Sequence, residues 1–211
     1  MNSKVLKLNR NLIPEIKSRL KAGEVIILPT DTVYALVANG NDTKAVTLLR
    51  QIKAFSSPQP LGVFTRKEKA EQVVKVDRAA LQMMNHFPYP VTMIMRAKPT
   101  LSEAVTNGFK NVFVTCPDRF IYDLVMEIPF PMVGTSAAFA GIQATDAELA
   151  VKFYGDKVSL IIDGGKSKHG RSGTLLDFTV EVPTIMTYGT VSLDDLRPLL
   201  PQIILPSHMM K

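Results

Sequence analysis

Apolar and polar residues recur along the chain in two short periods, which predict helices and strands in turn. A helix is predicted from Asn11, as its N-cap, to Leu20, because apolar residues three and four apart fall on one face. Gly23 is predicted to end this helix in a left-handed turn. A short run of β-branched and other apolar residues then predicts a buried strand over residues 24–28, broken by the polar turn at residues 29–32.

The same patterns continue through the rest of the chain. Capping residues and apolar spacing predict helices near 42–53, 67–73, 78–85, 145–154 and 192–195, with Asp42, a Thr145–Glu148 capping box and Ser192 as starts. Apolar runs predict strands at 61–64, 91–95, 112–116, 132–133, 159–162, 174–178 and 184–186. The prolines among residues 54–60 predict a loop. Helices are too few for strict alternation with strands, which favours an α/β fold with a mixed, twisted sheet.

Composition bounds the organisation of the chain. The 211 residues are 46% hydrophobic and 21% charged, an ordinary globular composition. No linker, repeat or low-complexity tract divides them. We therefore expect one domain over residues 1–205, with a flexible tail at 206–211.

Charge and cysteine content narrow the classes of function. A net charge of +6 suits a polyanion such as RNA or a nucleotide, although many basic proteins carry such charge without a specific partner. The single cysteine, Cys116, forms no internal disulfide, and the three histidines are too dispersed for a metal site. Without a membrane-length apolar run or a signal-peptide core, the sequence predicts a cytoplasmic protein.

Three segments combine small or polar residues with the ends of predicted strands, where α/β sheets place ligands. The first is Leu28–Leu36, which holds Pro-Thr-Asp-Thr at residues 29–32, and the second is Gly134–Gly141, which begins Gly-Thr-Ser. The third joins Ile162-Asp-Gly-Gly165 to Gly173–Asp177 through the basic loop at 166–171. Each segment also has an explanation without a ligand. These are a hydroxyl-capped turn for the first, close packing of elements for the second and a plain mobile loop for the third. No hydrolase elbow, Walker loop or dinucleotide-binding glycine pattern is present.

In this order, the three segments resemble the YrdC-like (threonylcarbamoyl-AMP synthase) family. The family's Pro-Thr-Asp/Glu-Thr-Val-Tyr motif is matched at residues 29–34, and its Thr-Ser-Ala-Asn-x-Ser-Gly segment is similar to residues 135–141. Its late Asp-Gly-Gly and Ser-Thr-Val-Val-Asp segments are similar to residues 163–165 and 173–177. Weaker matches lie at 53–55, 87–92, 114–117 and 187–189, so that the resemblance spans residues 10–200.

The resemblance implies a single YrdC-like domain around a basic concave cavity. It also implies synthesis of threonylcarbamoyl-AMP from threonine, bicarbonate and ATP with Mg²⁺, for a tRNA modification, and double-stranded-RNA binding. No tightly bound cofactor is expected. The implied substrate- or nucleotide-binding residues are Thr30, Thr32, Tyr34, Lys53, Thr135, Ser136, Thr174 and Asp177. The candidates for RNA contact are Lys166, Lys168 and Arg171.

The sequence also departs from the family pattern. Phe55, Thr115 and Thr187 stand where the family has arginines, Ala138 replaces an asparagine, Gly173 a serine, and Phe64 a histidine. Each charged hydrogen bond is worth about 1.5–3 kcal/mol, so three lost arginines would remove about 4–9 kcal/mol of binding energy. Lys166, Lys168 and Arg171 are the candidates to replace one of them.

Two functions stay open at this point. The chain is either an enzyme that adenylates a carbamoyl-type substrate, with impaired or altered activity, or a non-catalytic relative. A non-catalytic relative would bind double-stranded RNA, a nucleotide, a threonine-like small molecule or a protein partner.

Overall fold

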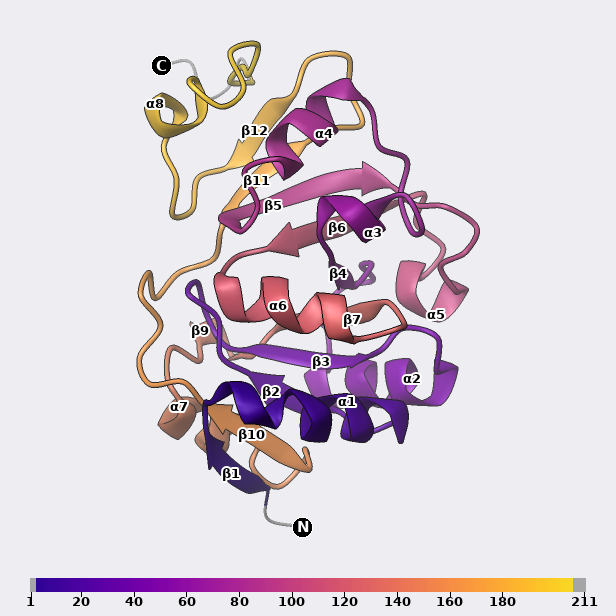
Figure 1. Cartoon of the computed structure of the whole chain (residues 1–211), viewed down its shortest axis with the longest axis vertical. Coiled ribbons are helices and arrows are strands. Elements are labelled where there is room, and N and C mark those ends of the chain that lie inside the picture. The colour runs from indigo at the N-terminus through magenta and orange to yellow at the C-terminus, as the bar shows by residue number, and fades with distance from the viewer. Residues whose placement is uncertain (1–2, 207–211) are drawn as a thin grey trace.

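A ten-stranded mixed sheet runs through the computed structural model, which describes residues 3–206 (Figure 1). Its strand order is β1-β10-β2-β3-β7-β4-β6-β5-β11-β12. The pairs β1–β10, β10–β2, β4–β6 and β5–β11 are parallel, and the other neighbours are antiparallel. The α/β fold with a mixed sheet, expected from the sequence, is confirmed. Residues 207–211 of the predicted tail lie outside the described residues.

The strands are short. The sheet contains β1 (Lys4–Lys7), β2 (Ile26–Leu28), β3 (Ala35–Asn39), β4 (Gly62–Phe64), β5 (Tyr89–Arg96), β6 (Asn111–Cys116), β7 (Met132–Ser136), β10 (Leu160–Asp163), β11 (Thr174–Asp177) and β12 (Thr184–Thr187). A separate hairpin pairs β8 (Ala138–Phe139) with β9 (Ile142–Gln143).

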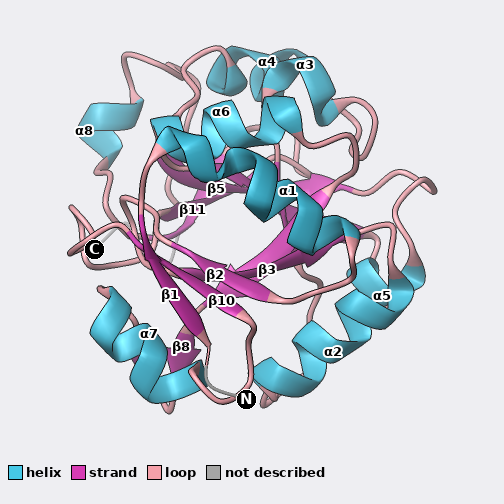
Figure 2. Ribbon diagram, turned by 60° about the horizontal axis from the view of Figure 1, so that its bottom comes forward, coloured by secondary structure: helices cyan, strands magenta, loops and turns pink. Residues whose placement is uncertain are grey.

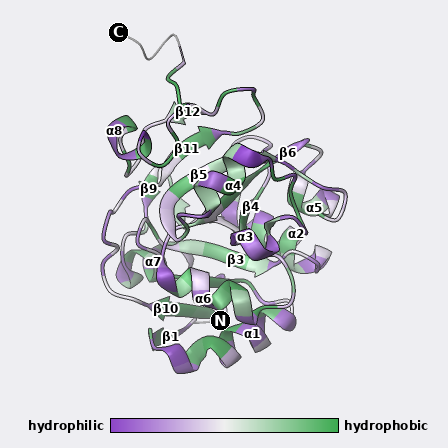
Figure 3. Cartoon of the chain, turned by 45° about the horizontal axis from the view of Figure 1, so that its top comes forward, coloured by the Kyte–Doolittle hydropathy of each residue, from purple (hydrophilic) through white to green (hydrophobic). Residues whose placement is uncertain are grey.

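Helices cover the sheet in two groups (Figure 2). One group is α1 (Ile13–Lys21), α3 (Lys67–Ala70), α4 (Arg78–Met84) and α6 (Arg119–Glu127), and the other is α2 (Thr43–Lys53), α5 (Glu103–Thr106) and α7 (Ala147–Tyr154). The short helix α8 (Leu193–Leu196) lies near the end of the described chain, and a 3-10 turn, η1 (Arg10–Leu12), precedes α1. Hydrophobic residues concentrate on strands that have a neighbour on each side, for example β3 and β10 (Figure 3).

Several helix starts differ from the sequence prediction. The cap expected at Asn11 is at Asn9, whose side chain accepts from the Asn11 N–H at the start of η1. The capping box expected at 145–148 is wrong, because Asp146 caps α7 by accepting from the Leu149 N–H. Asp42 and Ser192 cap α2 and α8 as predicted. Gly23 has the predicted left-handed backbone, with φ of 81°.

The sequence prediction missed several elements, among them β3 and α6. Strand β3 is buried at all five positions, so its residues show no alternation of polar and apolar types. Helix α6 did carry signals, since Asp118 caps it and Ile121, Leu124 and Val125 are buried on one face.

Within residues 3–206, no helix is both long and apolar enough to cross a membrane.

Candidate functional site

A cavity of about 410 Å³ is hollowed into one face of the sheet. Its floor follows the two-residue period of β4 and β6, since alternate residues of these strands line it while the residues between them are buried in the core. The lining residues are Thr30, Thr32, Val33, Ala35, Gln59, Pro60, Gly62, Phe64, Thr92, Phe113, Thr115, Pro117, Gly134, Thr135, Ser136, Arg171, Ser172, Gly173, Leu175, Thr187, Tyr188 and Gly189. Thus segments from both halves of the chain meet at one site.

The turn after β2 supplies two hydroxyls to this wall. The hydroxyl of Thr30 donates to the carbonyl oxygen of Val33 at 2.7 Å and lies 2.8 Å from the hydroxyl of Thr32. Because Thr30 has a single hydroxyl proton, Thr32 is the donor between the two hydroxyls. Thr32 Oγ1 therefore offers lone pairs, and no proton, to a ligand in the cavity.

Asp118 holds this turn from a neighbouring element. Its carboxylate accepts from the Asp31 N–H at 3.1 Å and from the Ile121 N–H at 2.9 Å, so that it also caps α6. The side chain is buried, and this burial raises the pKa of Asp118 to about 6 despite both N–H donors. The Thr30–Thr32 turn is thereby tied to the end of β6, beside the wall residue Pro117.

Thr135 and Ser136 reach the wall from the last two positions of β7. They were expected to follow the strand, but β7 extends through them and pairs Ser136 with Ala35 and Thr135 with Leu36 of β3. The sheet itself fixes both residues beside the threonine turn. Thr32 and Ser136 therefore line one cavity, as the family order of segments predicts.

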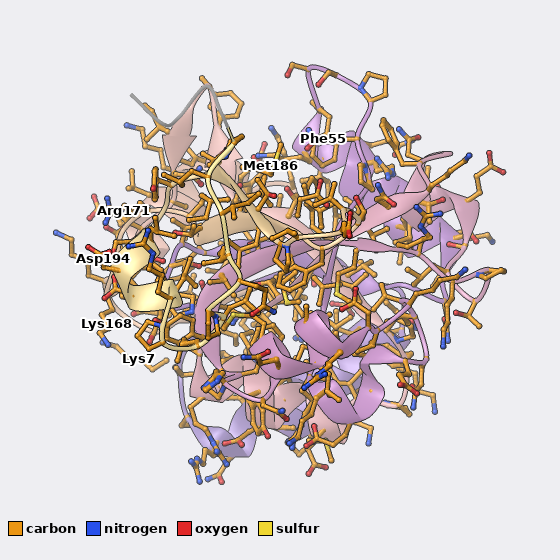
Figure 4. All side chains as sticks on the ribbon, turned by 90° about the horizontal axis from the view of Figure 1, so that it is seen from above. Lys7, Phe55, Lys168, Arg171, Met186 and Asp194 are labelled. Atoms are coloured by element: carbon orange, nitrogen blue, oxygen red, sulfur yellow. The ribbon has the colours of Figure 1, made fainter. Side chains whose placement is uncertain are left out.

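The basic loop at 166–171 is held against the same turn. The hydroxyl of Ser167 donates to the Thr30 carbonyl oxygen, and the His169 N–H donates to the Asp31 carbonyl oxygen, each at 2.8 Å. Arg171 lines the cavity, whereas Lys166 and Lys168 are exposed outside the wall. Figure 4 shows Arg171 and Lys168 on one flank of the molecule, away from Phe55. Among the described residues, Arg171 is the one charged side chain on the wall.

Four expected site residues lie off the wall. Tyr34 donates to the Gly165 carbonyl oxygen at 2.7 Å and accepts from the Gly164 N–H, and burial raises its pKa to about 12. Lys53 donates to the Ala138 carbonyl oxygen at 2.6 Å, and burial lowers its pKa. Thr174 is fully buried and bonded to Val191, and Asp177 accepts from Thr179. In this structure all four bond to neighbouring parts of the chain.

Some of the positions that depart from the family pattern lie on the cavity wall and others lie off it. Four of the six replaced positions line the cavity, namely Phe64, Thr115, Gly173 and Thr187. Phe55 lies in the loop after α2, with the Arg50 guanidinium 5.8 Å from its ring centre, and does not line the cavity.

Sequence reasoning missed the far side of the cavity. Thr92, Phe113 and Tyr188 come from β5, from β6 and from just after β12, and only the strand order brings them opposite the threonine turn. Thr92 and Tyr188 lie within the weaker family matches at 87–92 and 187–189 but were not named as site residues, and no motif marks Phe113. Residues 3–206 contain no cluster of three or more His, Cys, Asp or Glu side chains suited to a metal ion.

Comparison with known proteins places this fold. With its twisted mixed sheet and hollowed face, the chain is an α/β protein. One family model, described as "Telomere recombination", matches residues 18–189. The chain belongs to this Sua5/YciO/YrdC family.

Curated relatives share a common name. The threonylcarbamoyl-AMP synthases of Pyrococcus abyssi and Bacillus subtilis are each 28% identical to the chain, over 92% and 98% of its length. The chain spans 60% of the length of each of these two relatives. A putative threonylcarbamoyl-AMP synthase of Mycobacterium tuberculosis is also 28% identical, over 89% of this chain and 92% of that protein.

Solved structures agree on the fold. P. abyssi Sua5 in complex with L-threonine superposes with a TM-score of 0.87 at 23% identity, over 97% of this chain and 63% of that one. E. coli YciO superposes with a TM-score of 0.81 at 22% identity, over 94% of this chain and all of that one. At these identities the likeness establishes the fold alone.

Proposed function

We propose that the chain binds a small organic molecule in the cavity and makes little or no threonylcarbamoyl-AMP. One observation carries the proposal: Thr115 and Thr187 line the wall where the family resemblance expects arginines, which leaves Arg171 as the charged lining residue. The volume of about 410 Å³ lies in the range of small-molecule sites. The names of the relatives point to threonylcarbamoyl-AMP as the related product. The family resemblance adds threonine, ATP and a tRNA modification as the related chemistry.

The energetic argument concerns the phosphates of ATP. Two arginines lost from the wall remove about 3–6 kcal/mol of charge-assisted hydrogen bonding, or about two to four decades of affinity. The hydroxyls of Thr30, Thr32, Thr135 and Ser136 suit an amino acid or another polar molecule better than a triphosphate. Substrate binding is therefore retained more readily than adenylation.

The test measures binding and turnover separately. Calorimetric titration with L-threonine and with ATP–Mg²⁺ gives the two affinities, and threonine- and bicarbonate-dependent pyrophosphate release gives turnover. We expect weak ATP binding. We also expect turnover far below that of a relative that carries the motif arginines at the positions of Thr115 and Thr187. The variant T115R/T187R is expected to bind ATP at least about tenfold more tightly. Threonine-dependent pyrophosphate release by the unaltered chain at the relative's rate would refute the proposal.

A second candidate function is sequence-independent RNA binding. The observation that favours it is the pair Lys166 and Lys168, both exposed on the loop that carries Arg171. Three cations on one loop suit a phosphate backbone, and such binding weakens as salt rises. This candidate does not exclude the first, because two of the three cations lie outside the cavity.

A further inference from the structure

The cavity wall has two chemically different sides. Hydroxyls gather on one side, where the threonine turn meets the end of β7, and they come from Thr30, Thr32, Thr135 and Ser136. The other side, the aromatic side, carries Phe64, Phe113 and Leu175, with Thr92, Thr115 and Thr187 set among them. The wall therefore offers a ligand both polar and apolar contacts.

The aromatic side is shaped to receive a flat group. Phe64 and Phe113 belong to the paired strands β4 and β6, whose register places Gly62 opposite Phe113. Glycines stand next to the rings on this floor: a Cβ atom on Gly134 would lie 3.1 Å from the ring of Phe64, and one on Gly62 would lie 3.9 Å from Cβ of Phe113. Because neither glycine has a side chain, the cavity stays open over the strands beside both rings. Burial of an aromatic or other apolar group against them is favourable in proportion to the area removed from water.

One cation completes the wall. Arg171 ends a loop whose Ser167 and His169 are hydrogen-bonded to the threonine turn, so that its backbone is anchored on the cavity rim. The guanidinium is exposed and can pair with one carboxylate through two parallel hydrogen bonds. The wall has no second cation among the described residues for a second negative charge.

We infer that the ligand of this cavity is a small singly charged anion with a planar apolar group, such as an aromatic monocarboxylate, bound with its carboxylate at Arg171. The inference rests on the proposed small-molecule function and names its ligand class. Polyphosphates fit poorly, since one arginine cannot compensate several charges. Purely polar amino acids leave the aromatic side of the cavity unfilled.

The test uses four probes that separate charge from shape. They are 3-phenylpropanoate, its neutral amide, propanoate and inorganic triphosphate, each titrated into the full chain by calorimetry. We expect 3-phenylpropanoate to bind at least about tenfold more tightly than the amide, which lacks the charge, and than propanoate, which lacks the ring. Triphosphate that binds as tightly as 3-phenylpropanoate, or equal binding of the acid and its amide, would overturn the inference.

Variants locate the binding. Arg171→Gln is expected to weaken 3-phenylpropanoate about tenfold and to leave the amide unchanged, whereas Lys168→Ala, on the same loop outside the wall, changes neither. Circular dichroism confirms that each variant folds. Equal weakening in both variants, or none in Arg171→Gln, contradicts the assignment. The threonine and ATP titrations are independent of these probes, so failure of the ligand class is distinguishable from failure of the proposed function.

Discussion

At the residue scale, Asp118 links the stability of the fold to pH. Its pKa of about 6 in the folded chain is above the ordinary 3.8, so the folded state binds the proton more tightly than the unfolded state. This stabilisation is full below about pH 4 and is lost as the pH rises through 6. Asp118→Asn keeps an oxygen for the Ile121 N–H and cannot ionise, so it isolates the effect.

We expect the stability of the unaltered chain relative to Asp118→Asn to rise by about 2–3 kcal/mol between pH 7 and pH 4, at about 1.4 kcal/mol per unit of pKa shift. Urea unfolding of both proteins at pH 4, 5, 6 and 7 measures the difference. Other carboxylates titrate equally in the two proteins and cancel. A difference that stays constant across this range would show that Asp118 does not titrate as its burial requires.

Gly134 is the residue whose missing side chain shapes the cavity floor. A Cβ atom there would overlap the backbone carbonyl oxygen of Leu36, which the β3–β7 pairing holds in place. Gly134→Ala is therefore expected to destabilise the fold by about 3 kcal/mol in urea unfolding. Gly62→Ala is the matched control, because its Cβ atom would lie 3.2 Å from the Gly134 carbonyl oxygen and should cost about 1 kcal/mol. Equal costs for the two variants would contradict this account.

At the scale of elements, the loop at 166–171 is predicted to be held by Ser167. Loss of the Ser167 hydroxyl in Ser167→Ala removes its bond to the Thr30 carbonyl oxygen, worth about 1 kcal/mol. The His169 N–H, which bonds to Asp31, should then exchange with solvent deuterium about fivefold faster. Lys166→Ala changes an exposed neighbour and serves as the control. If both variants exchange alike, Ser167 does not hold the loop.

The elements also show what sequence patterns can and cannot predict. Short strands such as β6 were found because their residues alternate between core and cavity faces. Strand β3 was missed because it is buried on both faces, and β1, an edge strand that is mostly exposed, lacks an apolar run. Thr30, Thr32, Thr135 and Ser136 were found through two family motifs, at residues 29–34 and 135–141. Phe113 was not found, since no motif marks it and it joins the wall through strand order alone.

At the scale of the whole molecule, the net charge of +6 predicts weak binding of polyanions. Our prediction is that duplex RNA binds at low salt and that the affinity falls as salt rises, because Lys and Arg release counterions from phosphates. The triple variant K166A/K168A/R171A lowers the net charge from +6 to +3 (six minus three). If the loop binds the RNA, this variant reduces the affinity. It also reduces the slope of log affinity against log salt, by roughly one for each phosphate that is no longer neutralised.

A second triple variant separates the loop from charge in general. K21A/K44A/K75A also lowers the net charge to +3, at exposed lysines on other parts of the fold. Fluorescence anisotropy of a labelled RNA duplex of about 20 base pairs, followed from about 25 to 200 mM salt, compares the three proteins. A local site requires the loop variant to lose more affinity than this control, because counterion release depends on cations that touch phosphates. Equal losses would mean that the whole surface attracts RNA, and no binding at the lowest salt would mean that the basic charge only solvates the fold.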